Sequence, residues 1–129
     1  MTKKKILVVE DEAELTGAIQ IRLEQAGYEV LIAYDGQQAL EKARGENPDL
    51  IVLDLMLPKI DGYKVCRMLK FDEKYKKIPI VMLTARAQEK DESLGYEVGA
   101  DAFITKPFKY QALLSKIREL IGEDAPKLP

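Results

Sequence analysis

The sequence predicts an α/β fold, in which helices pack on both faces of a parallel β-sheet. Three observations support this prediction. Short apolar runs alternate five times with segments of helical periodicity. These runs contain few polar residues, which is typical of strands buried on both faces. Every run except the second ends in, or just before, a polar residue that could take part in a reaction. Together the observations favour a doubly wound sheet with right-handed crossover connections.

The five expected strands are rich in branched apolar side chains. They are Ile6–Val9, Glu29–Tyr34, Leu50–Asp54, Ile80–Thr84 and Ala102–Thr105. After the second strand, Asp35-Gly36 could form the turn of a β-hairpin. However, Asp35 and Gln38 also fit a capping box, and Ala39 and Leu40 continue with helical spacing. We therefore expect a strand-to-helix connection there.

Helical periodicity marks five further segments. They are Leu15–Ala26, Asp35–Ala43, Asp61–Leu69, Glu89–Val98 and Tyr110–Ile121. Glycines follow the first, fourth and fifth segments, where a helix can end. The fourth is the weakest, because Leu94 and Val98 are its only large aliphatic anchors and Gly95 lies inside it. With no repeat or second domain evident, we expect one domain over residues 1–122, followed by a tail or the start of a linker over 123–129.

Composition excludes several functions. The 20 basic and 22 acidic residues give a net charge of -2, which argues against a nucleic-acid-binding surface. Two lysine clusters, 3–5 and 74–77, are interpreted as solvated surface. The absence of histidine excludes a Ser-His-Asp triad, an HExxH metal site and self-phosphorylation on histidine. The single cysteine, Cys66, cannot form an internal disulfide and is expected to be buried. No signal peptide or membrane-spanning run is present, so a cytoplasmic location is expected.

Asp54 stands at the end of the most apolar strand and is followed by Pro58. A buried carboxylate without a partner is costly, so something must balance its charge. Ligands of open α/β sheets bind outside the carboxyl ends of the strands. We therefore interpret Asp54 as the reacting group of a site at this edge.

Polar residues at the ends of the other strands are the candidate partners of Asp54. Glu10 and Asp11 follow the first strand, Thr84 ends the fourth, and Lys106 follows the fifth. Each has an ordinary alternative: an acidic pair favours a helix N-terminus, a threonine can simply end a strand, and a lysine can occupy a surface turn. Their common placement after successive strands is what indicates a site.

The chemistry of this set points to phosphoryl transfer. Three carboxylates held together repel one another unless a cation lies among them, and hard oxygen ligands suit Mg²⁺. Mg²⁺, a lysine and a threonine are groups that can hold a phosphoryl group. Aspartate is an established nucleophile in phosphoryl transfer.

Four separated blocks then carry a specific resemblance. They are Val8–Glu12, Leu53–Gly62, Leu83–Ala85 and Gly99–Phe108. In this order they resemble the receiver domains of two-component response regulators, over about residues 4–122. The block from Met82 to Phe108 is more narrowly similar to receivers of winged-helix transcription factors. The resemblance implies a flavodoxin-like (βα)5 sheet with strand order 2-1-3-4-5.

The resemblance also implies roles at the site. Asp54 is expected to be the phosphoacceptor. Asp11 and Asp54 would bind Mg²⁺ together with the backbone carbonyl of Met56, while Glu10 would act through a metal-bound water. Lys106 would contact the phosphoryl group and would precede Pro107 through a cis peptide bond.

A switch and an output face are implied as well. Thr84 would move toward the phosphoryl group and Phe103 would turn inward behind it. This movement would reshape the face made by the fourth helix, the fifth strand and the fifth helix. Met56 and Arg86 are expected to border the path of the water that hydrolyses the phosphorylated site.

The expected partners are a sensor histidine kinase or phosphotransfer protein and an unnamed output partner. The resemblance to winged-helix receivers is incomplete, because Ala102 and Glu92 replace an acidic and a basic residue of their dimer interface. A monomer or a weak phosphorylation-dependent dimer is therefore expected, without direct DNA binding. The alternative function is a haloacid-dehalogenase-like phosphohydrolase. It needs an acid/base two residues after the nucleophile, where Met56 cannot transfer a proton.

Overall fold

The computed structural model describes residues 3–84 and 99–122 and contains a parallel sheet of five strands in the order β2-β1-β3-β4-β5. All four strand pairs are parallel. The strands are β1 (Lys5–Val9), β2 (Glu29–Ala33), β3 (Leu50–Asp54), β4 (Ile80–Thr84) and β5 (Ala102–Thr105). The α/β class, the parallel sheet and the strand order expected from the resemblance are therefore confirmed.

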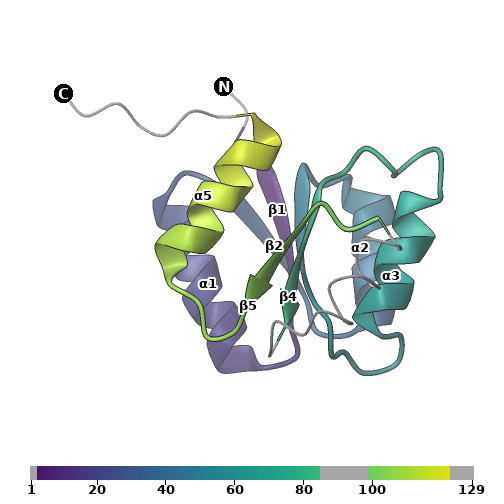
Figure 1. Ribbon diagram of the computed structural model, residues 1–129, viewed down its shortest axis with the longest axis horizontal. Coiled ribbons are helices and arrows are strands. Elements are labelled where there is room, and N and C mark those ends of the chain that lie inside the picture. The colour runs from purple at the N-terminus through teal and green to yellow at the C-terminus, as the bar shows by residue number, and fades with distance from the viewer. Residues whose placement is uncertain (1–2, 85–98, 123–129) are drawn as a thin grey trace.

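Helices cover both faces of this sheet, α1 and α5 on one side and α2 and α3 on the other (Figure 1). Their bounds are α1 (Ala13–Gln25), α2 (Gly36–Glu46), α3 (Gly62–Lys70) and α5 (Tyr110–Ile121). These agree with four of the five predicted helices. The remaining one, Glu89–Val98, lies outside the described residues, as do Arg86 and the tail 123–129.

Alternation along the strands divides the interior into two cores. In β1, Leu7 and Val9 belong to the core beneath α2 and α3, while Ile6 and Val8 belong to the core beneath α1 and α5. All four side chains have no exposed surface. The central strands β3 and β4 are buried along their whole length, as near-continuous apolar runs predict.

The connection from β2 to α2 resolves the ambiguity at Asp35-Gly36. Asp35 Oδ1 accepts a hydrogen bond from Gln38 N at 2.8 Å, so Asp35 is the N-cap of α2. The Gln38 side chain reaches back to Tyr34 N at 2.9 Å rather than to the N-cap itself. Because the segment after Asp35, Gly36–Glu46, is the helix α2 and not a strand, the hairpin alternative is excluded.

Other local predictions also hold. Cys66 is fully buried in the α2–α3 core, and burial raises the pKa of its thiol to about 12. Gly27 and Gly122 follow α1 and α5 with φ values of 99° and 89°, in the left-handed region that favours glycine. Lys74 and Lys77 are exposed, as a solvated surface requires. No described helix is long and apolar enough to cross a membrane.

Candidate functional site

Three polar side chains at the ends of strands lie on the same face of the sheet as the core beneath α1 and α5. In β1, β3 and β5, the side chains that face this core include Val8, Val52 and Ile104. Two residues after each of these stand Glu10, Asp54 and Lys106. Since successive strand side chains alternate between faces, all three point to the same side of the sheet. The fold therefore gathers an acid, a second acid and a base at one edge.

Lys106 bridges the two acids. Its Nζ lies 2.5 Å from Glu10 Oε1 and 3.3 Å from Asp54 Oδ2. Glu10 has no exposed surface and Asp54 is 4% exposed, so these are not solvent-screened surface contacts. A lysine separated from Glu10 by 96 positions in the chain thus supplies the partner that a buried Asp54 requires.

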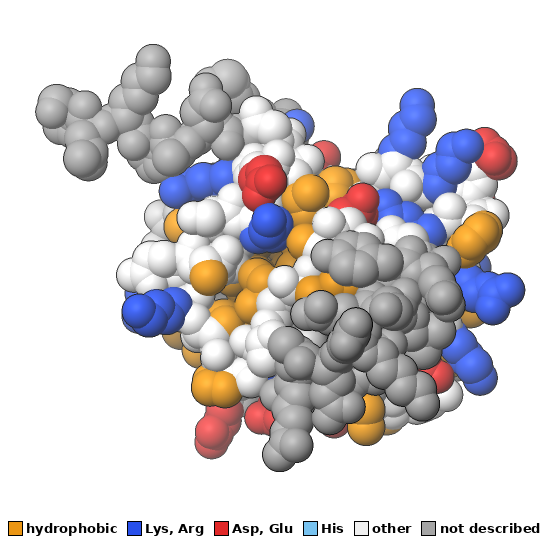
Figure 2. All heavy atoms as spheres, viewed as in Figure 1, with side chains coloured by type: hydrophobic (Ala, Val, Ile, Leu, Met, Phe, Trp, Pro, Cys, Tyr) orange, Lys and Arg blue, Asp and Glu red, His pale blue; other side chains and the backbone are white. Residues whose placement is uncertain are grey.

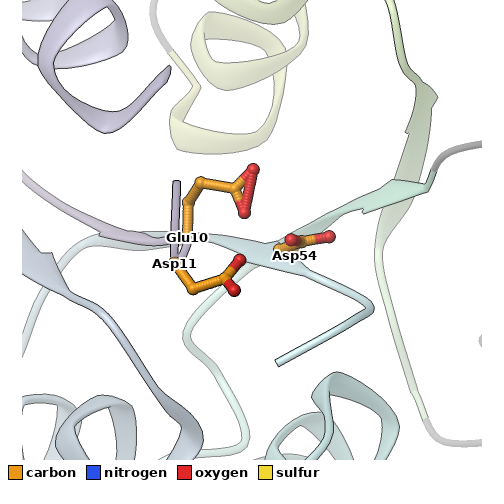
Figure 3. A group of neighbouring side chains, drawn as sticks. All are labelled: Glu10, Asp11 and Asp54. Carbon is orange, nitrogen blue, oxygen red and sulfur yellow. The ribbon is translucent and has the colours of Figure 1, made fainter. Parts of the chain in front are cut away.

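Asp11 completes a cluster of three carboxylates. One oxygen each of Glu10, Asp11 and Asp54 lies within 4.8 Å of the others. Figure 3 shows the carboxyl groups of Glu10 and Asp11, at the end of β1, beside that of Asp54 at the end of β3. Asp11 is exposed, which leaves the cluster open to solvent on its side.

The charges of this cluster are not balanced by protein groups alone. Burial, together with the neighbouring Asp54 carboxyl, raises the pKa of Glu10 from 4.5 to about 8. Burial acts to lower the pKa of Lys106, but Glu10 and Asp54 outweigh it, and the net shift is upward. One ammonium group thus faces three carboxylates, and the site favours binding another positive charge.

The donor set fits Mg²⁺. Carboxylate oxygens are the ligands that Mg²⁺ takes from proteins, and it retains several waters, which the open side by Asp11 permits. Glu10 Oε2 is buried and has no hydrogen-bond partner among the described residues. A buried carboxylate oxygen without a donor is the group that a metal-bound water would satisfy.

Thr84 and Phe103 share the opposite face of the sheet. The register pairs Met82 with Phe103 and Thr84 with Thr105, so Thr84 and Phe103 both point toward the α2–α3 side. Thr84 is 2% exposed, and its carbonyl accepts a hydrogen bond from Lys106 N at 2.6 Å. The peptide bond from Lys106 to Pro107 is cis, as the resemblance implies.

Met56 begins the loop that leaves the site. Its backbone N–H donates to Asp54 Oδ1 at 3.3 Å, and its side chain is 73% exposed. The structure therefore places Met56 beside Asp54 with its side chain in solvent. Arg86, the second residue expected to border the water path, lies outside the described residues.

The sequence interpretation missed the part that Gly36 and Gly62 play near this site. They are the first residues of α2 and α3. A Cβ at Gly36 would lie 2.0 Å from Ile60 O, and one at Gly62 would lie 2.3 Å from Asp54 O. The available signal was the Asp-Gly pair at each helix start, because glycine is a poor helix former and the preceding Asp already provides the cap.

The fold and the acidic cluster together fit one class of protein, the α/β domains that accept a phosphoryl group on a carboxylate beside Mg²⁺. Comparison with known proteins makes the assignment specific. The chain belongs to the response regulator receiver domain family, whose model matches residues 6–118. This confirms the resemblance found in the sequence.

Two curated relatives are transcriptional regulators. The chain is 48% identical to the alkaline phosphatase synthesis transcriptional regulatory protein PhoP of Bacillus subtilis, over 92% of this chain and 48% of that protein. It is 44% identical to the DNA-binding dual master transcriptional regulator RpaA of Synechocystis, over 91% of this chain and 48% of RpaA. The chain thus spans about half the length of these relatives.

Solved structures agree with the fold. A putative response regulator from Chloroflexus aurantiacus matches with a TM-score of 0.89 and 32% identity, over 95% of this chain and all of that one. The receiver domain of the sensor histidine kinase PA1611 from Pseudomonas aeruginosa matches with a TM-score of 0.87 and 33% identity, over 95% of this chain and 100% of that one. That structure has a magnesium ion coordinated in its active site cleft.

Proposed function

We propose that Asp54 accepts a phosphoryl group from the phosphohistidine of a sensor kinase or phosphotransfer protein. An Asp54 carboxylate oxygen attacks the phosphorus, the donor's P–N bond breaks, and an aspartyl phosphate forms. The observation that supports this most directly is the placement of Asp54, 4% exposed, between the Lys106 ammonium and the carboxylates of Glu10 and Asp11. We also propose that the domain's own residues assist both its phosphorylation and its dephosphorylation.

Asp11, Asp54 and the backbone carbonyl of Met56 are the proposed protein ligands of Mg²⁺. Glu10 would hold a metal-bound water through Oε2, the oxygen without a hydrogen-bond donor among the described residues. When bound, the ion neutralises charge that develops on the phosphoryl oxygens. The protein's own contribution is to orient the Asp54 carboxylate.

Lys106 is the proposed cationic contact of the phosphoryl group. Its ammonium already lies 3.3 Å from the oxygen Oδ2 of Asp54. A short movement away from Glu10 would bring it against a phosphoryl oxygen, where a fixed positive charge stabilises the transferred group.

The proposed switch joins Thr84 to Phe103. Both point to the same face on adjacent strands, so a shift of Thr84 toward a phosphoryl oxygen would change the space available to Phe103. The proposed output face is made of β5, α5 and the fourth predicted helix. Figure 2 shows hydrophobic side chains gathered on the face that carries β5 and α5, where a partner could bury them.

The alternative function, an aspartyl-phosphate phosphohydrolase, is disfavoured by the same geometry. Met56 stands where such an enzyme needs its acid/base, and its exposed thioether side chain cannot transfer a proton. We therefore propose that the domain is a signalling switch, and we expect it to work in the cytoplasm. It would be a monomer or a weak phosphorylation-dependent dimer, with residues 1–122 as the receiver domain.

Phosphorylation of Asp54 can be tested by mass. The chain is incubated with acetyl phosphate and Mg²⁺, and one added phosphoryl group is expected. EDTA or Asp54→Asn should abolish the gain, whereas Asp72→Asn, a carboxylate in the loop after α3, should leave it unchanged. A gain that survives Asp54→Asn would place the phosphoacceptor elsewhere.

Met56 and Arg86 are proposed to slow hydrolysis of the phosphorylated site. Met56 cannot orient a water through a strong hydrogen bond, and an arginine side chain offers donors only. The variant Met56→Asn with Arg86→Glu is therefore expected to lose phosphate several-fold faster than the wild type. An unchanged or slower decay would show that these positions do not gate the water.

A further inference from the structure

The loop that joins β3 to α3 is fixed at its base and at its tip. At the base, Leu55 N donates to Leu83 O at 3.0 Å, and Leu55 O accepts from Gly62 N at 3.0 Å. At the tip, Pro58 O accepts from Gly36 N, the first amide of α2, at 3.2 Å. Only Met56 and Leu57 lie between Leu55 and Pro58.

The tip itself is a strained turn. Ile60 N donates to Pro58 O at 2.8 Å, which closes a γ-turn around Lys59. Lys59 has a φ of 68°, a value that side-chain-bearing residues rarely adopt. Strained backbone persists only where its surroundings hold it, and it occurs often at functional sites.

The start of α2 supplies that support. Gly36 N offers one of the helix amides that have no partner within the helix, and Pro58 O satisfies it. The Lys59 ammonium lies 3.5 Å from the carboxylate of Asp35, the N-cap of α2. The approach is so close that a Cβ on Gly36 would overlap Ile60 O at 2.0 Å.

We propose that Asp35 and Gly36, at the start of α2, are positioning residues for the Mg²⁺ site. By holding the tip of the 55–61 loop, they determine where the Met56 carbonyl lies. The inference rests on the proposed function, in which that carbonyl is a ligand. Met56 is one residue from the fixed base and two from the docked tip, so its peptide group has little freedom to move. Mg²⁺ demands near-ideal octahedral geometry, and a displaced carbonyl would weaken its binding.

The test compares metal affinities measured from backbone amide shifts by NMR, starting from EDTA-treated protein. Gly36→Ala is expected to weaken Mg²⁺ binding roughly 10-fold, the size seen for groups that orient metal ligands. Gly45→Ala, in the same helix with nothing within 4 Å of the added Cβ, should leave the Mg²⁺ affinity unchanged. Equal Mg²⁺ affinities for wild type, Gly36→Ala and Gly45→Ala would overturn the proposal.

A second metal separates positioning from loss of stability. Ca²⁺ accepts variable coordination geometry, so Gly36→Ala should weaken Ca²⁺ binding much less than Mg²⁺ binding. A loop that had merely become unstable would lose both affinities alike, and that result would count against positioning. If Gly36→Ala does not fold, Asp35→Asn is the deciding variant, since asparagine can keep the cap while losing the charge. It should weaken Mg²⁺ binding about twofold, the scale of an ion pair with one exposed partner, since the Lys59 side chain is 64% exposed.

The wild-type protein gives an independent readout. During the Mg²⁺ titration, the amide of Gly36 should shift with the same midpoint as that of Met56, while that of Gly45 should not. A Gly36 amide that stays still at Mg²⁺ saturation would refute the coupling. If the wild type binds no Mg²⁺ at all, the proposed function fails instead, so the two failures are distinguishable.

Discussion

At the scale of single residues, the site is governed by an imbalance between one lysine and three carboxylates. Lys106 pairs with Glu10 and Asp54, but Asp11 adds a third negative charge. Burial, together with the neighbouring Asp54 carboxyl, raises the pKa of Glu10 to about 8. A bound proton on Glu10 and a bound cation are two ways of relieving the same repulsion.

Asp54→Asn is therefore expected to stabilise the metal-free protein. The substitution removes one carboxylate, and Glu10 remains 2.5 Å from Lys106 to keep the ammonium paired. In EDTA, we expect an increase on the order of 1 kcal/mol in the free energy of unfolding, or roughly 3–6 °C in melting temperature. A lower melting temperature would show that the carboxylates are not crowded.

The sign of the pH dependence follows from Glu10. Its pKa of about 8 in the folded state lies above the ordinary value of 4.5, so the folded protein holds this proton more tightly than the unfolded chain. The stability of the metal-free wild type should then fall as pH rises from 4.5 through 8. The advantage of Asp54→Asn should grow over that range, which melting curves in EDTA at several pH values would check.

At the scale of elements, Lys70 ties the end of α3 to the starts of two strands. Its ammonium lies 2.7 Å from Asp101 Oδ2 and donates to the carbonyls of Lys76 and Ile78 at 3.1 and 2.8 Å. Asp101 Oδ2 also accepts from Ile80 N at 2.8 Å. This ion pair, with the Lys70 end nearly buried, thus fixes the connection from α3 to β4 and the entry to β5, at the edge opposite the site.

Lys70→Met should be costly for this reason. The Lys70 side chain is 11% exposed and that of Asp101 is 34% exposed, so losing the ammonium leaves a carboxylate and two carbonyls partly desolvated. We expect a loss of about 2–3 kcal/mol in the free energy of unfolding, measured by urea denaturation. Lys76→Met is the matched control, because its pair with Glu73 is exposed and worth about 0–1 kcal/mol. Equal losses would contradict a special role for Lys70.

The contrast between these contacts explains what could be predicted from sequence. The carboxyl ends of parallel strands lie at a common edge, so the placement of Asp54, Thr84 and Lys106 at one site followed from the predicted parallel sheet. The contact of Lys70 with Asp101 left no such signal, because neither periodicity nor capping rules link two residues so far apart in the chain. The hydrogen bond from Gly36 N to Pro58 O could not be predicted from the sequence for the same reason.

At the scale of the whole molecule, one sheet joins the two cores and the site. The strands that carry Glu10 and Asp54 contribute side chains to both cores, so the site is built on the most buried part of the protein. Unfolding either core would separate the carboxylates. A ligand that binds them together should therefore stabilise the entire fold.

Mg²⁺ is accordingly expected to raise the melting temperature of the wild type. A ligand that binds only the native state adds about 2.7 kcal/mol at 100 times its dissociation constant. For a domain of this size, that corresponds to roughly 10 °C. Asp11→Asn should lose most of this rise, since it removes the exposed carboxylate that we propose as a ligand without disturbing the Lys106 pairs. NaCl at matched ionic strength should raise the melting temperature of the wild type only slightly, because screening acts weakly on buried charges. If NaCl raises the melting temperature as much as Mg²⁺ does, or if Asp11→Asn responds to Mg²⁺ like the wild type, the stabilisation does not come from a metal bound among these carboxylates.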